Sequence, residues 1–466
     1  MKVNASTRRQ FIKTASTAVT AFTILPRHVL GGPRFVPPSE KVNIAMIGQG
    51  GRGLENLTAL LGLADAQVMA VADPANVFSL EAFYYKGSGG RSVAKSRIEK
   101  HYAEKVPNFR CAEYEDFRVM LEKEKSIDAV LCATPDHLHA YVALRAMRAG
   151  KHVYCEKPLT HNIAEARAVA RVAKETGLAT QMGNQGHSSN GIRDTVEHLR
   201  GGTIGTVREI HAWVPAKRWN PGLVTKPTES MPVPAGINWD LWLGPREPRA
   251  FNTAYFPVSW RDFWTFGTSA MGDFGCHDLD AACWAFDLQP PTRVEALAVG
   301  PTDDEIAPHG STIFYDFAAN GAQPPIRLTW YDGGVRPRAP ELLGKFPLPR
   351  RGVMFVGEKG VIQCDGAGGA PRLFPESLRT APKPAQTLKR VAGHHRDWLD
   401  AIKGGDAAGS NFEYGARLTE IGLLGVLSLR LRKPFDWDAA NMKAVGIPEA
   451  EPLIKGTYRA GWELAV

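Results

Sequence analysis

The chain has 466 residues, 44% of them hydrophobic, and a formal net charge of +8 at pH 7. This composition allows a large buried core and, at roughly 150 residues per domain, predicts two or three domains. The excess positive charge is spread along the chain, which argues against a nucleic-acid-binding protein and is interpreted as an aid to solubility or a mild preference for anionic ligands. The six cysteines include no CxxC pair and are interpreted as buried thiols, not as a disulfide framework or a zinc site.

Residues 1–35 are predicted to be a twin-arginine export signal. Residues 7–13 read TRRQFIK, which resembles the full consensus, and a modest apolar run, 15–25, follows. That run is too short for an ordinary membrane span and suits the hydrophobic part of a signal. A chance Arg-Arg pair is the alternative, and without a clean A-x-A site a retained anchor stays open. We expect a periplasmic or otherwise exported protein that passes the twin-arginine machinery with its cofactor loaded.

A glycine-rich motif follows the first predicted strand, 42–47. It reads Gly48-Gln49-Gly50-Gly51-Arg52-Gly53 and opens a helix with an apolar face. In a G-x-G-x-x-G motif the first glycine makes the tight turn, the second lets a pyrophosphate approach the backbone, and the third lets helix and strand pack closely. This setting predicts dinucleotide binding. A glycine-rich turn that binds nothing is the alternative.

The second predicted strand, 67–72, ends at Asp73, about 20 residues beyond the last glycine. A carboxylate there hydrogen-bonds the ribose 2′-hydroxyl and repels a 2′-phosphate, so NAD is favoured over NADP. The more polar residues 83–105, with Gly87-Ser88-Gly89-Gly90, are predicted to be an insertion or mobile loop. Residues 114–121 are predicted to be helical.

Residues 129–160 predict a strand, a helix and a second strand. The strand 129–133 ends at Thr134-Pro135-Asp136, the helix 139–149 ends at Gly150, and the strand 153–155 leads into Glu156-Lys157-Pro158. Such a unit implies a right-handed crossover in a parallel sheet, and ligands bind beyond the carboxyl ends of its strands. Lys157 is therefore expected at a reactive position. A surface ion pair with Glu156 is the alternative.

A helix, 163–176, and a strand, 179–183, complete this half of the chain. The strand opens into Asn184-Gln185-Gly186-His187, which is either a ligand contact or a satisfied polar turn. Alternating strands then predict an antiparallel sheet, at 207–214, 294–299, 312–317, 326–330, 352–356 and 361–364. The long excursion 217–266 is rich in aromatic residues, which either pack over the sheet or line a carbohydrate cleft.

A second polar constellation introduces a helix that runs through Trp284. Asp273, His277 and Asp280 are spaced i, i+4 and i+7, so they share one side of the helix if it begins early. His277 is placed near the helix N-terminus, where the dipole would keep the imidazole neutral, and either aspartate would orient it. A capping segment with a satisfied histidine and a metal site are the alternatives. No metal is expected, because hydride transfer to a nicotinamide does not require one.

The chain is predicted to end with two helices, one that begins at 394 and one at 412–431, followed by an aromatic tail. The tail is expected to be tied down or to form a subunit contact.

These motifs, in this order, resemble the glucose–fructose oxidoreductase / inositol dehydrogenase (Gfo/Idh/MocA) family. The resemblance rests on Gly48–Gly53, residues 134–139, Glu156-Lys157-Pro158 and Asp273-x-x-x-His277-x-x-Asp280, and covers essentially all the chain after Glu40. It is nearest to the exported subgroup. It implies an α/β protein: a Rossmann parallel sheet in domain 40–185, an α/β domain with an open, mainly antiparallel sheet in 186–430, a tail in 431–466, and dimers or tetramers.

The resemblance also implies the site. Lys157, Asp273 and His277 are the expected catalytic residues around the nicotinamide. The expected cofactor-binding residues are Gly48, Gln49, Gly50, Gly51, Arg52, Gly53, Asp73, Thr134, Pro135, His139, Glu156, Lys157 and Asn184.

Two enzymatic hypotheses follow, both with a small carbohydrate as substrate. In the first, the protein is an NAD(P)-dependent oxidoreductase acting on a secondary hydroxyl of a sugar, glycoside or cyclitol: His277 takes the proton and Lys157 stabilises the reacting oxygen. In the second, it is a glycosidase that oxidises C3 transiently and eliminates the aglycone. A binding protein on an inactive dehydrogenase fold is the third alternative, and the intact Lys157, Asp273 and His277 argue against it.

Overall fold

The computed structural model describes residues 36–380 and 382–466, and the chain divides into the units Met1–Lys41 and Val42–Val466. The described part of the first unit holds a 3₁₀ turn, Pro38–Glu40. The predicted export signal, 1–35, lies outside the described residues. Everything below concerns the second unit. Since both sheets belong to that one compact unit, the predicted domain limits stay a prediction.

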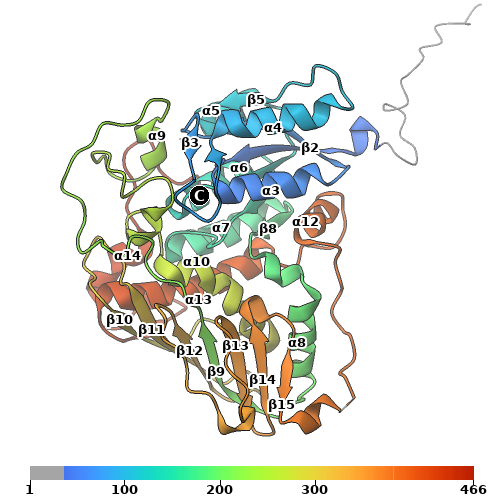
Figure 1. The fold of residues 1–466 in the computed structure, drawn as a ribbon, viewed down its shortest axis with the longest axis vertical. Coiled ribbons are helices and arrows are strands. Elements are labelled where there is room, and N and C mark those ends of the chain that lie inside the picture. The colour runs from blue at the N-terminus through green and yellow to red at the C-terminus, as the bar shows by residue number, and fades with distance from the viewer. Residues whose placement is uncertain (1–35, 381) are drawn as a thin grey trace, which may run out of the picture. The chain divides into compact units, whose positions relative to one another are not determined.

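The first half of this unit is a six-stranded parallel sheet (Figure 1). In spatial order its strands are β5 (Ala112–Tyr114), β2 (Ala66–Ala72), β1 (Val42–Ile47), β6 (Ala129–Cys132), β7 (His152–Cys155) and β8 (Thr180–Met182). The central strands β1 and β6 are buried on both faces, as a parallel sheet covered by helices requires. The strand order reverses between β1 and β6, which is the topological switch point where a doubly wound sheet binds its ligand. The predicted Rossmann sheet is confirmed.

Helices cover both faces of this sheet. They are α3 (Gly51–Leu61), α4 (Arg91–Ala103), α5 (Phe117–Lys123), α6 (Asp136–Arg148) and α7 (Ile163–Thr176). α7 begins with a capping box between Asn162 and Glu165 and ends at Gly177, whose φ is +64°. α6 begins three residues earlier than predicted, because Asp136 already belongs to its first turn.

Two local predictions were wrong. Residues 83–105 are not simply an insertion or mobile loop, because the helix α4 occupies 91–103. Only Ala94 and Ile98 of this helix are buried, so its apolar face is too narrow to be recognised in the sequence. Residues 114–121 are not one helix, because β5 ends at Tyr114 and α5 begins only at Phe117, after Asp116 as N-cap. Between β2 and α4 lies a small hairpin of β3 (Phe78–Ser79) and β4 (Ser88–Gly89).

The second half is built on a nine-stranded mixed sheet. Its spatial order is β15 (Arg372–Phe374), β14 (Val361–Asp365), β13 (Gly352–Gly357), β9 (Val207–Trp213), β12 (Ile326–Tyr331), β11 (Gly310–Phe317), β10 (Arg293–Val299), β16 (Phe435–Asp438) and β17 (Lys443–Ala444). Only the β9–β12 pair is parallel among its strands, so the predicted, mainly antiparallel sheet is confirmed.

Helices lie between the two sheets in Figure 1. α13 (Phe412–Leu431) is buried along most of its length and packs against α7, α10 (Ser269–Asp278) and β10. The remaining helices are α8 (Asn190–Arg200), α9 (Trp239–Leu243), α11 (Asp280–Phe286), α12 (His394–Ile402) and α14 (Glu451–Lys455). In the described part of the chain, no helix is both long and apolar enough to span a membrane.

The aromatic excursion between β9 and α10 mostly forms a core of its own. Trp239, Tyr255 and Trp260 are buried there with Phe263 and Phe266. The C-terminal tail is tied down, because Trp462 is buried against Tyr141 and under the guanidinium of Arg118.

Candidate active site

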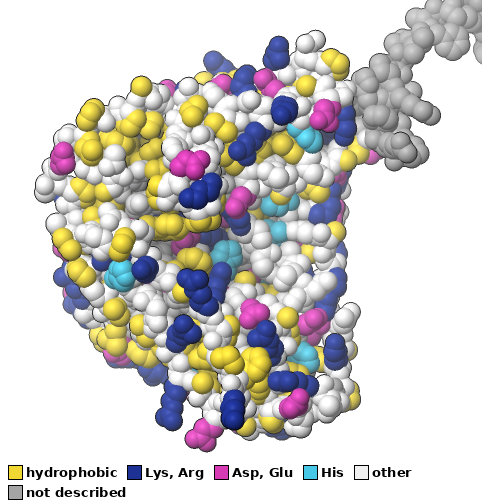
Figure 2. Space-filling view, viewed as in Figure 1, with side chains coloured by type: hydrophobic (Ala, Val, Ile, Leu, Met, Phe, Trp, Pro, Cys, Tyr) yellow, Lys and Arg dark blue, Asp and Glu magenta, His cyan; other side chains and the backbone are white. Residues whose placement is uncertain are grey.

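A pocket of about 230 Å³ opens between the glycine-rich loop and α10. Figure 2 shows the hollow near the middle of this face, with a histidine in it and Lys and Arg side chains along its lower edge. The pocket brings together most of the predicted site residues: Gly48, Gly50, Gly51, Arg52, Asp73, Thr134, Pro135, His139, Glu156, Lys157, Asp273 and His277. Of the remaining predicted residues, Gln49 and Gly53 lie in the glycine-rich loop behind it.

The glycine-rich loop has the shape that a dinucleotide needs. Gly48 has φ +86°, and a Cβ there would lie 2.6 Å from the Ala133 carbonyl oxygen. A Cβ on Gly53 would lie 2.1 Å from the Gly48 carbonyl oxygen, so strand and helix approach closely. Gly50, the N-cap of α3, faces open space. The helix N-terminus therefore presents its backbone N–H groups to a space that suits a pyrophosphate.

Asp73 joins the end of β2 to this loop. Its carboxylate accepts the backbone N–H of Gln49 at 2.6 Å and that of Ala75 at 2.8 Å. Burial raises the pKa of Asp73 to about 6, against the lowering effect of the two N–H donors. The carboxylate lines the pocket at the position where a ribose hydroxyl would bind. The loop, the helix N-terminus and Asp73 together fit NAD.

Lys157 reaches from the end of β7 to α10. Its Nζ donates to Asp273 Oδ1 at 2.5 Å and to the Asp273 carbonyl oxygen at 2.8 Å, and both side chains are largely buried. Arg261 contacts the same carboxylate oxygen at 3.4 Å. Burial alone would raise the pKa of Asp273, but Lys157 and Arg261 outweigh it and hold that pKa well below its usual range. Asp273 is therefore an anion at any working pH.

Lys157 is not paired with Glu156, the alternative considered above. Glu156 instead accepts hydrogen bonds from Arg52 at 3.2 Å, Asn56 at 2.9 Å and Gln185 at 2.9 Å. Glu156 thus ties the glycine-rich helix to the turn after β8. The side chain of the neighbouring Lys157 forms no ion pair with Glu156 and lines the pocket.

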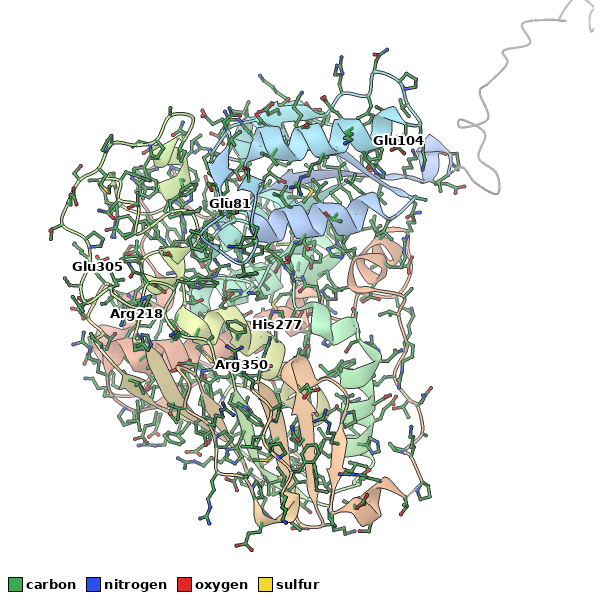
Figure 3. The ribbon with its side chains drawn as sticks, viewed as in Figure 1. Glu81, Glu104, Arg218, His277, Glu305 and Arg350 are labelled. Carbon is green, nitrogen blue, oxygen red and sulfur yellow. The ribbon has the colours of Figure 1, made fainter. Side chains whose placement is uncertain are left out.

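His277 lies in the last turn of α10, not near its N-terminus as predicted, so the dipole argument was wrong (Figure 3). The expectation that the imidazole of His277 is neutral still holds, but for another reason. Burial, reinforced by the positive charges of Lys157, Arg351 and Arg52, holds the pKa of His277 well below its ordinary value. The imidazole is neutral and able to accept a proton.

Asp280 does not orient His277. α10 ends at Asp278 and Asp280 begins α11, where its carboxylate contacts His187 Nδ1 at 2.9 Å and accepts from the Tyr414 hydroxyl at 2.5 Å. Asn184, a predicted cofactor contact, is fully buried and donates to Asp280 at 2.9 Å. The turn at 184–187 is therefore a satisfied polar turn behind the pocket.

His139 contacts both of the loops that flank the pocket. Its Nδ1 lies 2.7 Å from the Pro158 carbonyl oxygen and its Nε2 lies 2.8 Å from that of Thr134. Cys132, His139 and Cys155 are close enough to share a metal ion, but both ring nitrogens already contact carbonyl oxygens. We assign His139 to holding the loops that carry Thr134 and Lys157.

Several pocket residues were missed from the sequence. Tyr84 and Tyr85 reach the pocket from the β3–β4 hairpin, and Arg351 reaches it from the loop before β13. The ring of Tyr85 covers the glycine-rich loop: a Cβ on Gly51 would lie 2.1 Å from it. In the aromatic excursion, Trp239 and Tyr255 only pack, as one interpretation expected. Trp242 and Trp260 also line the pocket, and its use as a carbohydrate cleft stays a prediction. Only tertiary contacts bring these side chains here.

The structure combines a doubly wound parallel sheet and its dinucleotide loop with a second sheet that meets it at a Lys–Asp–His site. These features define the class of NAD-binding Rossmann proteins that carry a second sheet. Residues 42–184 match a family model described as an oxidoreductase family with an NAD-binding Rossmann fold, and residues 214–322 match the C-terminal alpha/beta domain of the same family. The two matches cover more than half of the chain. The chain belongs to the GFO_IDH_MocA family.

Curated relatives agree with this assignment. The chain is 35% identical over 148 residues to dTDP-3,4-didehydro-2,6-dideoxy-alpha-D-glucose 3-reductase of Streptomyces violaceoruber, covering 31% of this chain and 42% of that protein. It is 34% identical over 152 residues to a glycosyl hydrolase family 109 protein of Stenotrophomonas maltophilia, covering 33% and 30%. The match thus spans less than half the length of either relative.

The fold resembles the WlbA dehydrogenase of Bordetella pertussis, solved with NADH and UDP-GlcNAcA. The TM-score is 0.57 at 15% identity, and the match covers 85% of this chain and 99% of that one.

Proposed function

We propose that the protein is an NAD-dependent oxidoreductase that transfers hydride at a secondary hydroxyl of a sugar, glycoside or cyclitol. One observation carries the proposal: Lys157, from the cofactor-binding half, and Asp273 and His277, from the second half, line one pocket beside the glycine-rich loop. A cation, a fixed carboxylate and a neutral imidazole at one point suit the oxidation of an alcohol. Bound NAD would supply the hydride acceptor at this pocket.

The side chains of the pocket accept the proton, stabilise the reacting oxygen and position the donor. His277, held neutral, accepts the hydroxyl proton. Lys157 donates a hydrogen bond to the reacting oxygen and stabilises the negative charge that develops there. Asp273 holds the Lys157 ammonium at 2.5 Å, and Arg261 holds Asp273 in turn, so the donor is positioned before the substrate binds.

A second function, a glycosidase that oxidises and re-reduces its substrate, is supported by two observations. One curated relative is a glycosyl hydrolase family 109 protein, and the Tyr85 ring covers the glycine-rich loop in a way that suits a cofactor retained between turnovers. Transient oxidation would acidify the neighbouring C–H, and the aglycone would leave by elimination. Water would then add to the double bond, and the ketone would be reduced again, which returns the hydride to the substrate. The same lysine and histidine would serve both functions.

One experiment separates the two functions. The purified protein, with no cofactor added, is denatured and its supernatant assayed for NAD; the native protein is screened against free sugars and aryl glycosides. Ordinary dehydrogenase activity gives NADH that accumulates with a sugar and added NAD. A redox glycosidase gives stoichiometric bound NAD and aglycone release with no net NADH. Failure of hydride transfer with every sugar and glycoside would refute both.

Location and assembly are further proposals. The TRRQFIK segment supports export through the twin-arginine pathway, and replacing Arg8 and Arg9 by lysine should retain the protein in the cytoplasm of a bacterial host. The open sheet supports a homo-oligomer, since β10 exposes Leu297 and Val299. Light scattering on the purified chain should give a dimer or tetramer mass, and replacing both residues by serine should lower it.

A further inference from the structure

A second pocket, of about 300 Å³, adjoins the first and is used by nothing described so far. The two pockets share Arg261, Asp273 and Phe274 in their walls. The second pocket is closed on its other side by the loop after β9, which brings Lys217, Arg218 and Trp219 to it. A substrate group that extends past Asp273 from the reacting carbon would therefore enter this second pocket.

The N-terminus of α10 faces this second pocket. Ser269 and Ala270, the first two residues of the ten-residue helix, line it. The first backbone N–H groups of a helix have no intrahelical partner, and together with the dipole they favour an anion. Ser269 also has φ +62°, a left-handed conformation that is costly for a residue with a side chain and is concentrated at functional sites.

Two cations on the opposite wall are independent of the helix. Lys217 is exposed and has no ion-pair partner among residues 36–380 and 382–466. Arg218 is only 5% exposed; it donates to the carbonyl oxygens of Leu223 and Pro301, but its buried Nε has no hydrogen-bond partner (Figure 3 labels its position). Arg218 forms no ion pair within the part of the chain that the structure describes, so its buried guanidinium holds a positive charge that an anion in the second pocket would compensate.

The carboxylates at this second pocket are already satisfied. Asp262 accepts the backbone N–H groups of Trp219 and Asn220 at 2.8 and 2.7 Å. Asp273 is bound by Lys157 and Arg261. Three cations, Lys217, Arg218 and Arg261, line this pocket with the two carboxylates, so the wall carries a net charge of about +1 that one carboxylate of a ligand would neutralise. A dianion would leave the filled pocket with excess negative charge.

We infer that the second pocket binds the carboxylate of the substrate, so that the substrate class is an acidic sugar, such as a uronic acid or its glycoside. Lys217, Arg218 and the N-terminus of α10 would hold the carboxylate while the secondary hydroxyl lies at His277 and Lys157. This inference rests on the proposed function for the position of the reacting hydroxyl. The binding of an acidic sugar can be measured without any turnover.

The test measures binding to the full chain saturated with NADH, which prevents oxidation of an alcohol. Calorimetry compares methyl uronides of the gluco, galacto and manno series with their neutral methyl hexosides and with the hexose 6-phosphates. At least one uronide should bind about ten-fold more tightly than its neutral parent, and raising the salt concentration should weaken only the uronide. Equal affinity within all three pairs, or tightest binding by the 6-phosphates, would overturn the inference.

Variants locate the binding. Lys217→Met should weaken the uronide about five-fold and leave the neutral hexoside unchanged; because Lys217 is exposed and unpaired, the fold should not suffer. Lys226→Met is the matched control, an exposed lysine on the same excursion that is outside both pockets. A uronide preference that survives Lys217→Met unchanged would overturn the site. If uronides bind but no sugar is oxidised, the proposed function fails while this inference stands.

Discussion

The Nζ of Lys157 lies 2.5 Å from Oδ1 of Asp273, and this ion pair joins the two halves of the molecule at the floor of the pocket. Lys157 follows β7 of the Rossmann sheet, and Asp273 lies on α10, one of the helices between the two sheets (Figure 1). The pair is largely buried, with side-chain exposures of 12% and 14%. Replacing Asp273 would leave the Lys157 ammonium without its carboxylate partner, and replacing Lys157 would leave Asp273 with Arg261 alone, so the pair is the natural point to test.

Lys157→Met should lower kcat by about 10²–10³, because it removes the donor to the reacting oxygen, while the affinity for NAD should change little. Steady-state kinetics and NAD titration check the two parts. Lys174→Met, an exposed position on α7, is the control and should behave as the parent. An equal loss of NAD binding in Lys157→Met would mean that Lys157 serves the cofactor and not the chemistry.

The pH profile should report a neutral base. Because burial and nearby cations hold the pKa of His277 well below 6.5, its neutral form persists as the pH falls, so kcat should stay level through pH 6.5 and decline only at lower pH. His277→Gln should abolish this acid limb together with most of the activity. The double variant Arg351→Gln/Asp278→Asn removes one cation near His277 together with the carboxylate that lies 2.9 Å from that cation. The pKa of His277 should then rise, so the decline of kcat in acid should begin at a higher pH. A limb that moves to lower pH would contradict this assignment of the base.

Cofactor affinity should have its own pH dependence. The Asp73 carboxylate is the form that accepts a ribose hydroxyl, and the pKa of Asp73 is raised to about 6 by burial. The carboxylate is present above that pKa, so the Kd for NAD should rise as the pH falls through about 6. Asp73→Asn should raise the Kd at pH 8 by about ten-fold and remove this dependence. Titration of both proteins with NAD across the pH range measures these values. An unchanged Kd in Asp73→Asn would refute the proposed contact between Asp73 and the ribose.

The Tyr85 ring should slow the release of the cofactor. The ring lies over Gly51, so Tyr85→Ala should increase the dissociation rate of NADH, measured by its fluorescence, more than it changes the rate of hydride transfer. Tyr85→Phe keeps the ring and is the matched control. Identical dissociation rates in all three proteins would show that the hairpin does not retain the cofactor.

The tail should contribute to stability. Trp462 is 5% exposed and packs against Tyr141 and Arg118, so Trp462→Ala should lower the free energy of unfolding by about 3–5 kcal/mol. Val466→Ala, at an exposed position, should change it by less than about 0.5 kcal/mol. Denaturant unfolding of the three proteins measures both values. A small effect of Trp462→Ala would mean that the tail is only loosely held.

The cofactor half could be predicted because its chemistry is local in the sequence. The glycine-rich loop and Asp73 lie at the ends of successive strands of a parallel sheet, so their positions follow from the order of the elements. The convergence of Lys157 with Asp273 and His277 joins residues more than a hundred positions apart and needed the motif resemblance to be expected, whereas the contact of Arg261 with Asp273 was not predicted.

Other features could not be predicted for physical reasons. α4 was missed because only two of its residues are buried, and the place of His277 within α10 was wrong because the helix begins at Ser269, directly after an aromatic loop without a clear N-cap. Tyr84, Tyr85 and Arg351 carry no sequence signal at all, since the folding of their loops alone brings them to the pocket.

The most direct measurement is a single turnover of the NAD-loaded protein mixed with sugars and glycosides, followed by NADH absorbance, for the parent chain and Lys157→Met. Both proposed functions require hydride to reach NAD, as accumulated or transient NADH. The parent should form NADH with at least one substrate, and Lys157→Met, with the same NAD content, should form it at least a hundred-fold more slowly. An absence of NADH with every substrate, or equal rates in the two proteins, would contradict the account.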